Sequence, residues 1–268
     1  MTKRCLWLVA GMIVCSAAPA PAQRAELARA RAAYNEQQFE AAIEAALTAQ
    51  KVGDTADAAT VVLSRSYLER YRQRANPADL AAARAQLGTV RVANLDARDH
   101  VDFMMALGEA LFFEDDFGAA AAIFESGIDA AFAQGTATGE SMLDWWGSAV
   151  ERQTEALDRE KRAPVFQRMR ERMTRELAKN PGSPAAGYWS VVAIRGEGDA
   201  VGAWDAAIAS WVRARMAGPR SAQLRADLDK LVLEGIIPDR VRLFPSEQRG
   251  QAESDLRTDW AVVKERWK

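Results

Sequence analysis

Apolar residues recur about every three to four positions along almost the whole chain after residue 23, which is the spacing of one face of an α-helix. Short apolar runs such as Val61-Val62-Leu63 lie inside this helical period, so we expect no strands. Breaks rich in Gly, Pro, Asn and Asp interrupt the pattern at fairly even intervals. The pattern therefore predicts an all-α chain built from five helix pairs: 24–36 with 39–50, 55–74 with 77–92, 100–113 with 117–133, 140–159 with 162–179, and 184–195 with 201–216.

The third pair has the clearest pattern. Two amphipathic segments between Asp102 and Gly127 meet at an acidic turn, Glu114-Asp115-Asp116. Gly108 and Ala120 are small residues flanked by large apolar ones, as is typical where two helices approach closely. We therefore expect Gly108 and Ala120 to face each other across the pair.

Parts of this pair recur elsewhere in the chain. Leu107-Gly108 returns 39 residues later as Trp146-Gly147, and Phe39-Glu40-Ala41-Ala42 returns 78 residues later as Phe117-Gly118-Ala119-Ala120. The order of large and small residues resembles a tetratricopeptide repeat (TPR), whose usual period is about 34 residues. The resemblance implies a right-handed superhelical solenoid of about five helix pairs, because a single pair cannot bury its apolar face alone. An irregular helical bundle is the alternative.

The C-terminal part follows a different pattern. A helix near 220–235 is expected to end at Ile236-Ile237-Pro238, and Ser246 is placed to cap a last helix that carries Trp260 and Trp267. Solenoids need a terminal segment that covers the exposed core of the last repeat. We interpret these residues as capping helices, with a docking strip for a partner helix as the alternative.

The N-terminus has the pattern of a secretory signal peptide. Lys3 and Arg4 precede an apolar run over 6–14, and Ala20-Pro21-Ala22 follows as a site of small residues. We expect cleavage after Ala22; an uncleaved anchor and a lipid on Cys15 are the alternatives. We therefore expect three segments: a signal peptide (1–22), TPR-like helical repeats (23–218) and a C-terminal helical cap (219–268). We expect the mature protein to be in the periplasm of a bacterium or secreted.

The composition of the chain argues against several kinds of bond and partner. Both cysteines lie in the signal peptide, so the exported chain would have no disulfide and no thiol. Without Lys3 and Arg4 it has 33 basic and 37 acidic side chains, a net charge of −4, which does not indicate nucleic acid. No later apolar run has the length of a transmembrane segment, and nothing in the composition indicates the oligomeric state.

The residues offer little for catalysis. His100 is the one histidine, so no two-histidine metal site can form, and no nucleophile elbow or phosphate-binding loop is present. The acids at Asp96, Asp99 and Asp102 could hold a cation, but we interpret Asp99 as the cap of the following helix. We therefore expect no catalytic, cofactor-binding or metal-binding residue.

The resemblance also implies where a partner binds, because the first helices of successive TPRs line a concave groove. Aligning Gly108 and Gly147 with the family's small position places residues of two neighbouring repeats at that groove, among them Asp102 and Ser141. The residues that we predict for a partner-binding groove are Met105, Glu109, Phe112, Phe113, Asp144, Trp145, Ser148, Glu151 and Arg152.

One TPR subfamily binds the C-terminal carboxylate of a peptide with lysine and asparagine in this groove. Met105, Glu109, Asp144 and Ser148 stand there instead, so this chain departs from that subfamily. The resemblance favours an exported, non-enzymatic scaffold or adaptor that binds a protein or peptide partner in the cell envelope. A periplasmic solute- or lipid-binding accessory of a transport system is the alternative, and an enzyme is the least favoured interpretation.

Overall fold

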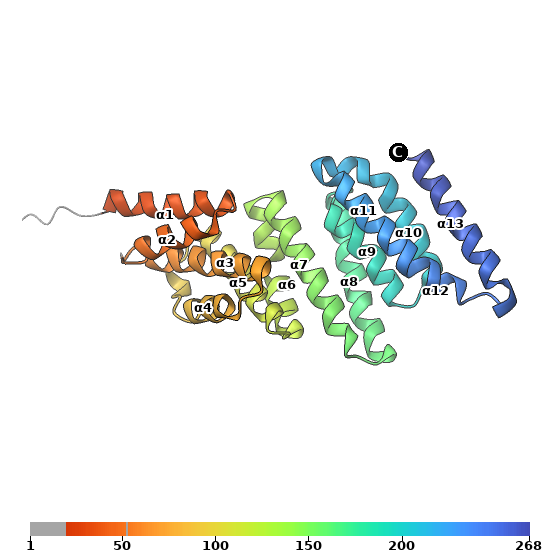
Figure 1. Cartoon of the computed structure of the whole chain (residues 1–268), viewed down its shortest axis with the longest axis horizontal. Helices are drawn as coiled ribbons and strands as arrows, with labels where there is room; N and C mark the ends of the chain where they lie inside the picture. Colours follow the sequence, from red (N-terminus) through yellow and green to blue (C-terminus); the bar gives the residue numbers. More distant parts are fainter. Residues whose placement is uncertain (1–19, 52) are drawn as a thin grey trace, which may run out of the picture.

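The computed structural model describes residues 20–51 and 53–268, so most of the segment 1–22 that we predicted to be a signal peptide lies outside the described residues. Throughout the described part the regular elements are helices, with no strand, so the all-α prediction is confirmed. The helices follow one another from α1 at one end of an elongated molecule to α13 at the other (Figure 1). None of these helices is both long enough and apolar enough to cross a membrane.

The helix boundaries lie close to most of the predicted ones in the five pairs, but the helix predicted over 77–92 ends at Leu87, and the one predicted over 140–159 spans Thr136–Glu155. The helices are α1 (Ala20–Asn35), α2 (Phe39–Ala49), α3 (Ala56–Arg74), α4 (Pro77–Leu87), α5 (Ala97–Phe113), α6 (Phe117–Gln134), α7 (Thr136–Glu155), α8 (Arg159–Lys179), α9 (Pro184–Gly196), α10 (Ala200–Arg213), α11 (Ser221–Leu231), α12 (Ile237–Val241) and α13 (Arg249–Arg266).

Local chemistry explains why several helices begin where they do. The side chain of Asn76 accepts a hydrogen bond from the Ala78 amide at 3.1 Å, and Pro77 fills the first helical position, where its missing N–H costs nothing. Asp116 caps α6 in the same way. The turn before it requires a positive φ of 61° at Asp115, a conformation that aspartate tolerates better than most residues.

The odd-numbered helices α1, α3, α5, α7, α9 and α11 form a row in which each contacts the next. The even-numbered α2, α4, α6 and α10 pack against this row. The fourth predicted pair is an exception, because α7 packs along α6 and α9 and touches α8 much less. The helix α8 instead packs on α9, where the Phe166 ring lies against Gly196.

The close approaches are made by glycine, but the predicted partner of Gly108 is wrong. A Cβ on Gly108 would lie 2.4 Å from Cε1 of Phe124, so the Phe124 ring of α6 occupies the space that we assigned to Ala120. Gly147 similarly accommodates the ring of Trp189, 2.3 Å from where a Cβ would stand. This second contact joins α7 to α9, and therefore one helix pair to the next.

The C-terminal helices differ from prediction in two places. The helix does not end at Ile236-Ile237-Pro238: a π-helical turn, Val232–Ile236, leads directly into α12, whose first turn accepts Pro238. Ser246 does not cap α13, because its hydroxyl donates to the Glu247 carboxylate. Trp260 of α13 is fully buried, and its Nε1 donates to Asp229 at 2.7 Å.

Candidate functional site

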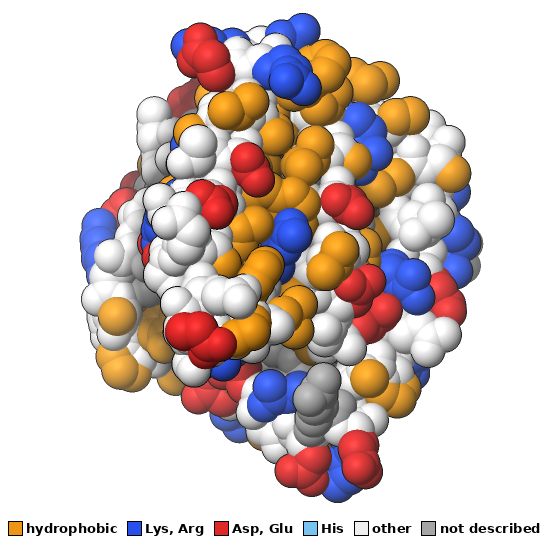
Figure 2. All heavy atoms as spheres, turned by 90° about the vertical axis from the view of Figure 1, so that its right-hand side faces the viewer, with side chains coloured by type: hydrophobic (Ala, Val, Ile, Leu, Met, Phe, Trp, Pro, Cys, Tyr) orange, Lys and Arg blue, Asp and Glu red, His pale blue; other side chains and the backbone are white. Residues whose placement is uncertain are grey.

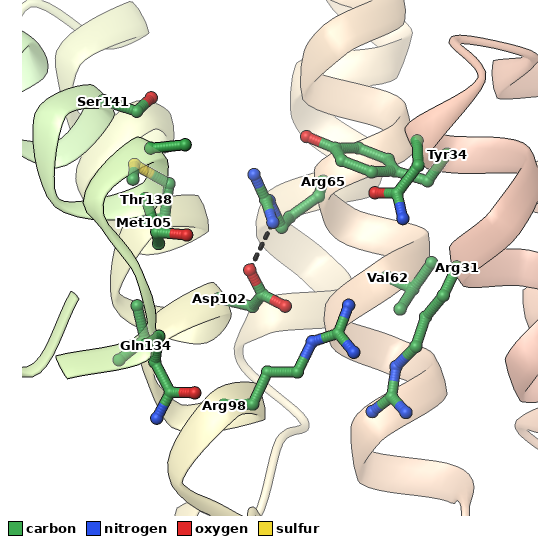
Figure 3. A pocket seen from close by; sticks show the side chains of 13 residues that line it. Arg31, Tyr34, Val62, Arg65, Arg98, Asp102, Met105, Gln134, Thr138 and Ser141 are labelled. Carbon is green, nitrogen blue, oxygen red and sulfur yellow. Dashed lines mark hydrogen bonds and ion pairs between the residues drawn. The ribbon is translucent and has the colours of Figure 1, made fainter. Parts of the chain in front are cut away.

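The row of first helices carries a pocket of about 600 Å³. Its walls come from α1, α3, α5 and α7, together with the last residue of α6 (Figure 3). We call it the arginine pocket, and it is lined by Arg31, Tyr34, Asn35, Val62, Arg65, Arg98, Val101, Asp102, Met105, Gln134, Ala137, Thr138 and Ser141.

Helical spacing presents these side chains together. Arg98, Asp102 and Met105 stand four and three residues apart, and Thr138 and Ser141 three apart, so each helix contributes one face. Because α1, α3, α5 and α7 lie in consecutive contact, residues more than a hundred positions apart in sequence line one cavity.

Three arginines dominate the charge of this pocket. Arg65 pairs with Asp102, and its guanidinium lies 4.6 Å from the centre of the Tyr34 ring. Arg31 pairs with Asp99, which is buried behind it. These pairings orient two of the three guanidinium groups.

Unused donors remain at the pocket. The Nε groups of Arg31 and Arg65 are buried and have no hydrogen-bond acceptor among the described residues. Arg98 is exposed and makes no hydrogen bond or ion pair with any residue that the structure describes (Figure 3). Charged donors of this kind bind carboxylate or phosphate oxygens most strongly.

Glu109 lies buried on α5, with 3 % of its surface exposed. Burial raises the pKa of its carboxyl to about 7, Arg65 opposes the shift, and Glu69 adds to it. Burial likewise raises the pKa of Tyr34. Our expectation that Glu109 faces solvent in a groove is therefore wrong, because α3 with its charged residues covers it.

The other predicted groove residues do not share one wall. Met105 lines the arginine pocket, as do Asp102 and Ser141. Phe112, Phe113 and Trp145 form an aromatic cluster, with the Trp145 ring 5.2 Å from that of Phe112 and 5.8 Å from that of Phe113.

Arg152 also lies apart from the pocket. It is exposed, pairs with Glu155, and stacks 5.0 Å from the Phe117 ring. Glu151 is half-buried on the same helix, and burial raises the pKa of its carboxyl.

Asp144 and Ser148 line a second pocket of about 290 Å³ between α7, α9 and α11. We call it the acidic pocket, and its lining residues are Asp144, Ser148, Pro184, Ala185, Tyr188, Trp189, Arg220, Gln223, Leu224 and Asp227. Burial raises the pKa of Asp144, although the Trp189 Nε1 donates to its carboxylate at 2.8 Å. Burial, followed by the charges of Glu151, Asp227 and Asp144, raises the pKa of Tyr188 to about 12.

The acids before α5 have structural partners. Asp96 caps the helix by accepting from the Asp99 amide at 2.8 Å, so our assignment of the cap to Asp99 is wrong. Asp99 and Asp102 pair with Arg31 and Arg65. In residues 20–51 and 53–268, no three His, Cys, Asp or Glu side chains gather in a way that could hold a metal ion.

Sequence reasoning missed the three arginines. They stand at positions 31, 65 and 98, spacings of 34 and 33 residues that match the usual TPR period and could have drawn attention to them. The period alone does not show that they converge, because Arg98 lies in the first turn of its helix and Arg65 in the middle of another.

No family model, no curated protein and no solved structure matches this chain.

Proposed function

We propose that this protein is an exported, non-enzymatic helical-repeat scaffold or adaptor that binds a protein or peptide partner in the cell envelope. The partner lies along the row of first helices. One observation carries the proposal: four successive first helices, α1, α3, α5 and α7, contribute side chains to a single open pocket. This is the arrangement by which a solenoid offers an extended binding surface.

The finer description of the fold belongs to the same proposal. We infer a right-handed superhelix of about five TPR-like pairs, which ends in the capping helices from residue 219 onward. Contacts between each first helix and the next support this inference. The burial of Trp260 against the last repeat, with the Trp211 ring 5.4 Å away, supports the capping role of α13.

A solute- or lipid-binding accessory is the second candidate, and the composition of the pocket walls argues against a lipid. A lipid site is mostly apolar. Among the residues that line the arginine pocket, only Val62, Val101, Met105 and Ala137 are aliphatic or thioether side chains. The rest are hydroxyl, amide, guanidinium and carboxylate side chains and the phenol of Tyr34, which favours a polar chain such as a peptide.

The test is affinity capture from an envelope extract with a matched pair of variants. Ser141 is exposed at the arginine pocket, so Ser141→Trp fills the pocket without disturbing the core. Ser126 is exposed on α6 away from the pocket, and Ser126→Trp is the control. We expect proteins that are held by the unmodified chain and by the control to be lost with Ser141→Trp. Equal capture by all three would contradict binding along this row.

A further inference from the structure

One face of α7 contributes side chains to both the arginine pocket and the acidic pocket. Thr138 and Ser141 line the first, and Asp144 and Ser148 line the second. Their spacings of three, three and four residues place all four side chains on a single stripe of the helix. From Thr138 to Ser148 the helix axis rises about 15 Å, a length that about five residues of extended peptide span.

The two pockets differ in charge. Arg31, Arg65 and Arg98 line the first, where Asp102 is the opposing charge. The guanidinium of Arg98 is exposed and has no ion-pair partner among the described residues, so it is free to donate to acceptor oxygens of a ligand. Carboxylates supply such oxygens in the geometry that a guanidinium prefers.

The acidic pocket has the opposite preference. Asp144 and Asp227 line it, and Arg220 is the opposing charge. The rings of Tyr188 and Trp189 also line it, and a cation gains from an aromatic face as well as from a carboxylate. This pocket therefore suits an ammonium or guanidinium group.

We propose that the partner presents one extended peptide segment of split charge, with acidic side chains in the arginine pocket and a basic side chain in the acidic pocket. The proposal rests on the proposed function and specifies its ligand. A uniformly acidic segment would place a carboxylate beside Asp144 and Asp227, and a uniformly basic one would place a cation among three arginines. Like charges at an interface weaken association, so split charge selects the partner and its direction.

The experiment measures binding of fluorescent peptides of equal length and composition by polarisation at low salt. One has a glutamate block followed by a lysine block, one has the reverse order, and one alternates glutamate and lysine. We expect one block peptide to bind more tightly than the alternating peptide. Raising the salt should weaken this binding, because exposed charges are screened.

Matched variants test whether the charged residues of each pocket contribute to peptide binding. Arg98→Gln and Asp227→Asn each remove one charge from a pocket, and each should weaken the block peptide about two- to fivefold. The controls are Arg175→Gln and Asp205→Asn, since both residues are exposed and lie outside the two pockets. Neither control should change the affinity.

Three results would overturn the proposal: equal affinity for all three peptides, no binding of any peptide, or equal effects of the pocket variants and the controls. The proposed function has its own test. If a captured partner is lost with Ser141→Trp but is unaffected by both Arg98→Gln and Asp227→Asn, the scaffold function stands and the split-charge ligand is wrong.

Discussion

Removing the charge of Glu109 should stabilise the protein, and the gain should depend on pH. Glu109 is 3 % exposed, and burial raises the pKa of its carboxyl from 4.5 to about 7. Between these pH values the folded chain holds a proton that the unfolded chain has released. The free energy of unfolding therefore falls as the pH rises through this window.

The size of the effect follows from the two pKa values. A difference of one in pKa corresponds to about 1.4 kcal/mol, so the ionised carboxylate costs the folded chain about 3 kcal/mol above pH 7. Glu109→Gln replaces it with a neutral group of nearly the same shape. The variant should be more stable by roughly this amount at about pH 8, and by much less at about pH 5.

Urea unfolding followed by circular dichroism at both pH values measures the difference. Glu44→Gln is the matched control, because Glu44 is an exposed acid of α2 with no ion pair among the described residues. A gain for Glu109→Gln that is the same at both pH values would refute the reasoning. So would an equal pH-dependent gain for Glu44→Gln.

Two further predictions concern packing and export. Gly108→Leu should clash with the Phe124 ring and lower the free energy of unfolding by about 1–3 kcal/mol. Gly250→Leu is the control, because Gly250 lies in open space on α13 and its substitution should leave the free energy of unfolding nearly unchanged. Equal shifts of the two variants in thermal melts would disprove the contact. N-terminal sequencing of exported protein should begin at Gln23, and material that still begins at Met1 would disprove cleavage.

Helix positions could be predicted from the sequence because local chemistry sets them. A capping Asn or Ser followed by proline and alanine begins α4 and α9, and the acidic turn at Asp115 and Asp116 separates α5 from α6. These signals act over a few residues, within the reach of a capping side chain or a turn. The five pairs therefore lie close to the ranges that the sequence predicts.

Contacts between helices could not be predicted in the same way. Arg31 meets Asp99 across 68 residues of chain, and Gly108 meets Phe124 because of the angle at which two helices cross. Glu109 has the spacing of a groove residue, yet α3 covers it and places Arg65 beside it. Each of these facts depends on how one helix tilts over another, which periodicity within a single helix does not encode.

The tryptophans are unevenly distributed along the chain. Residues 23–144 contain no tryptophan, whereas the rings of Trp204 and Trp211 lie 5.9 and 5.4 Å from that of the buried Trp260. Trp145, Trp146 and Trp189 lie on α7 and α9, so intrinsic tryptophan emission reports the part of the molecule from α7 to α13, while backbone dichroism reports every helix. If the chain is the solenoid that we propose, its helix pairs can open from one end, and the two signals would then separate along a denaturation curve. The unmodified chain thus carries its own probe of the direction in which it unravels.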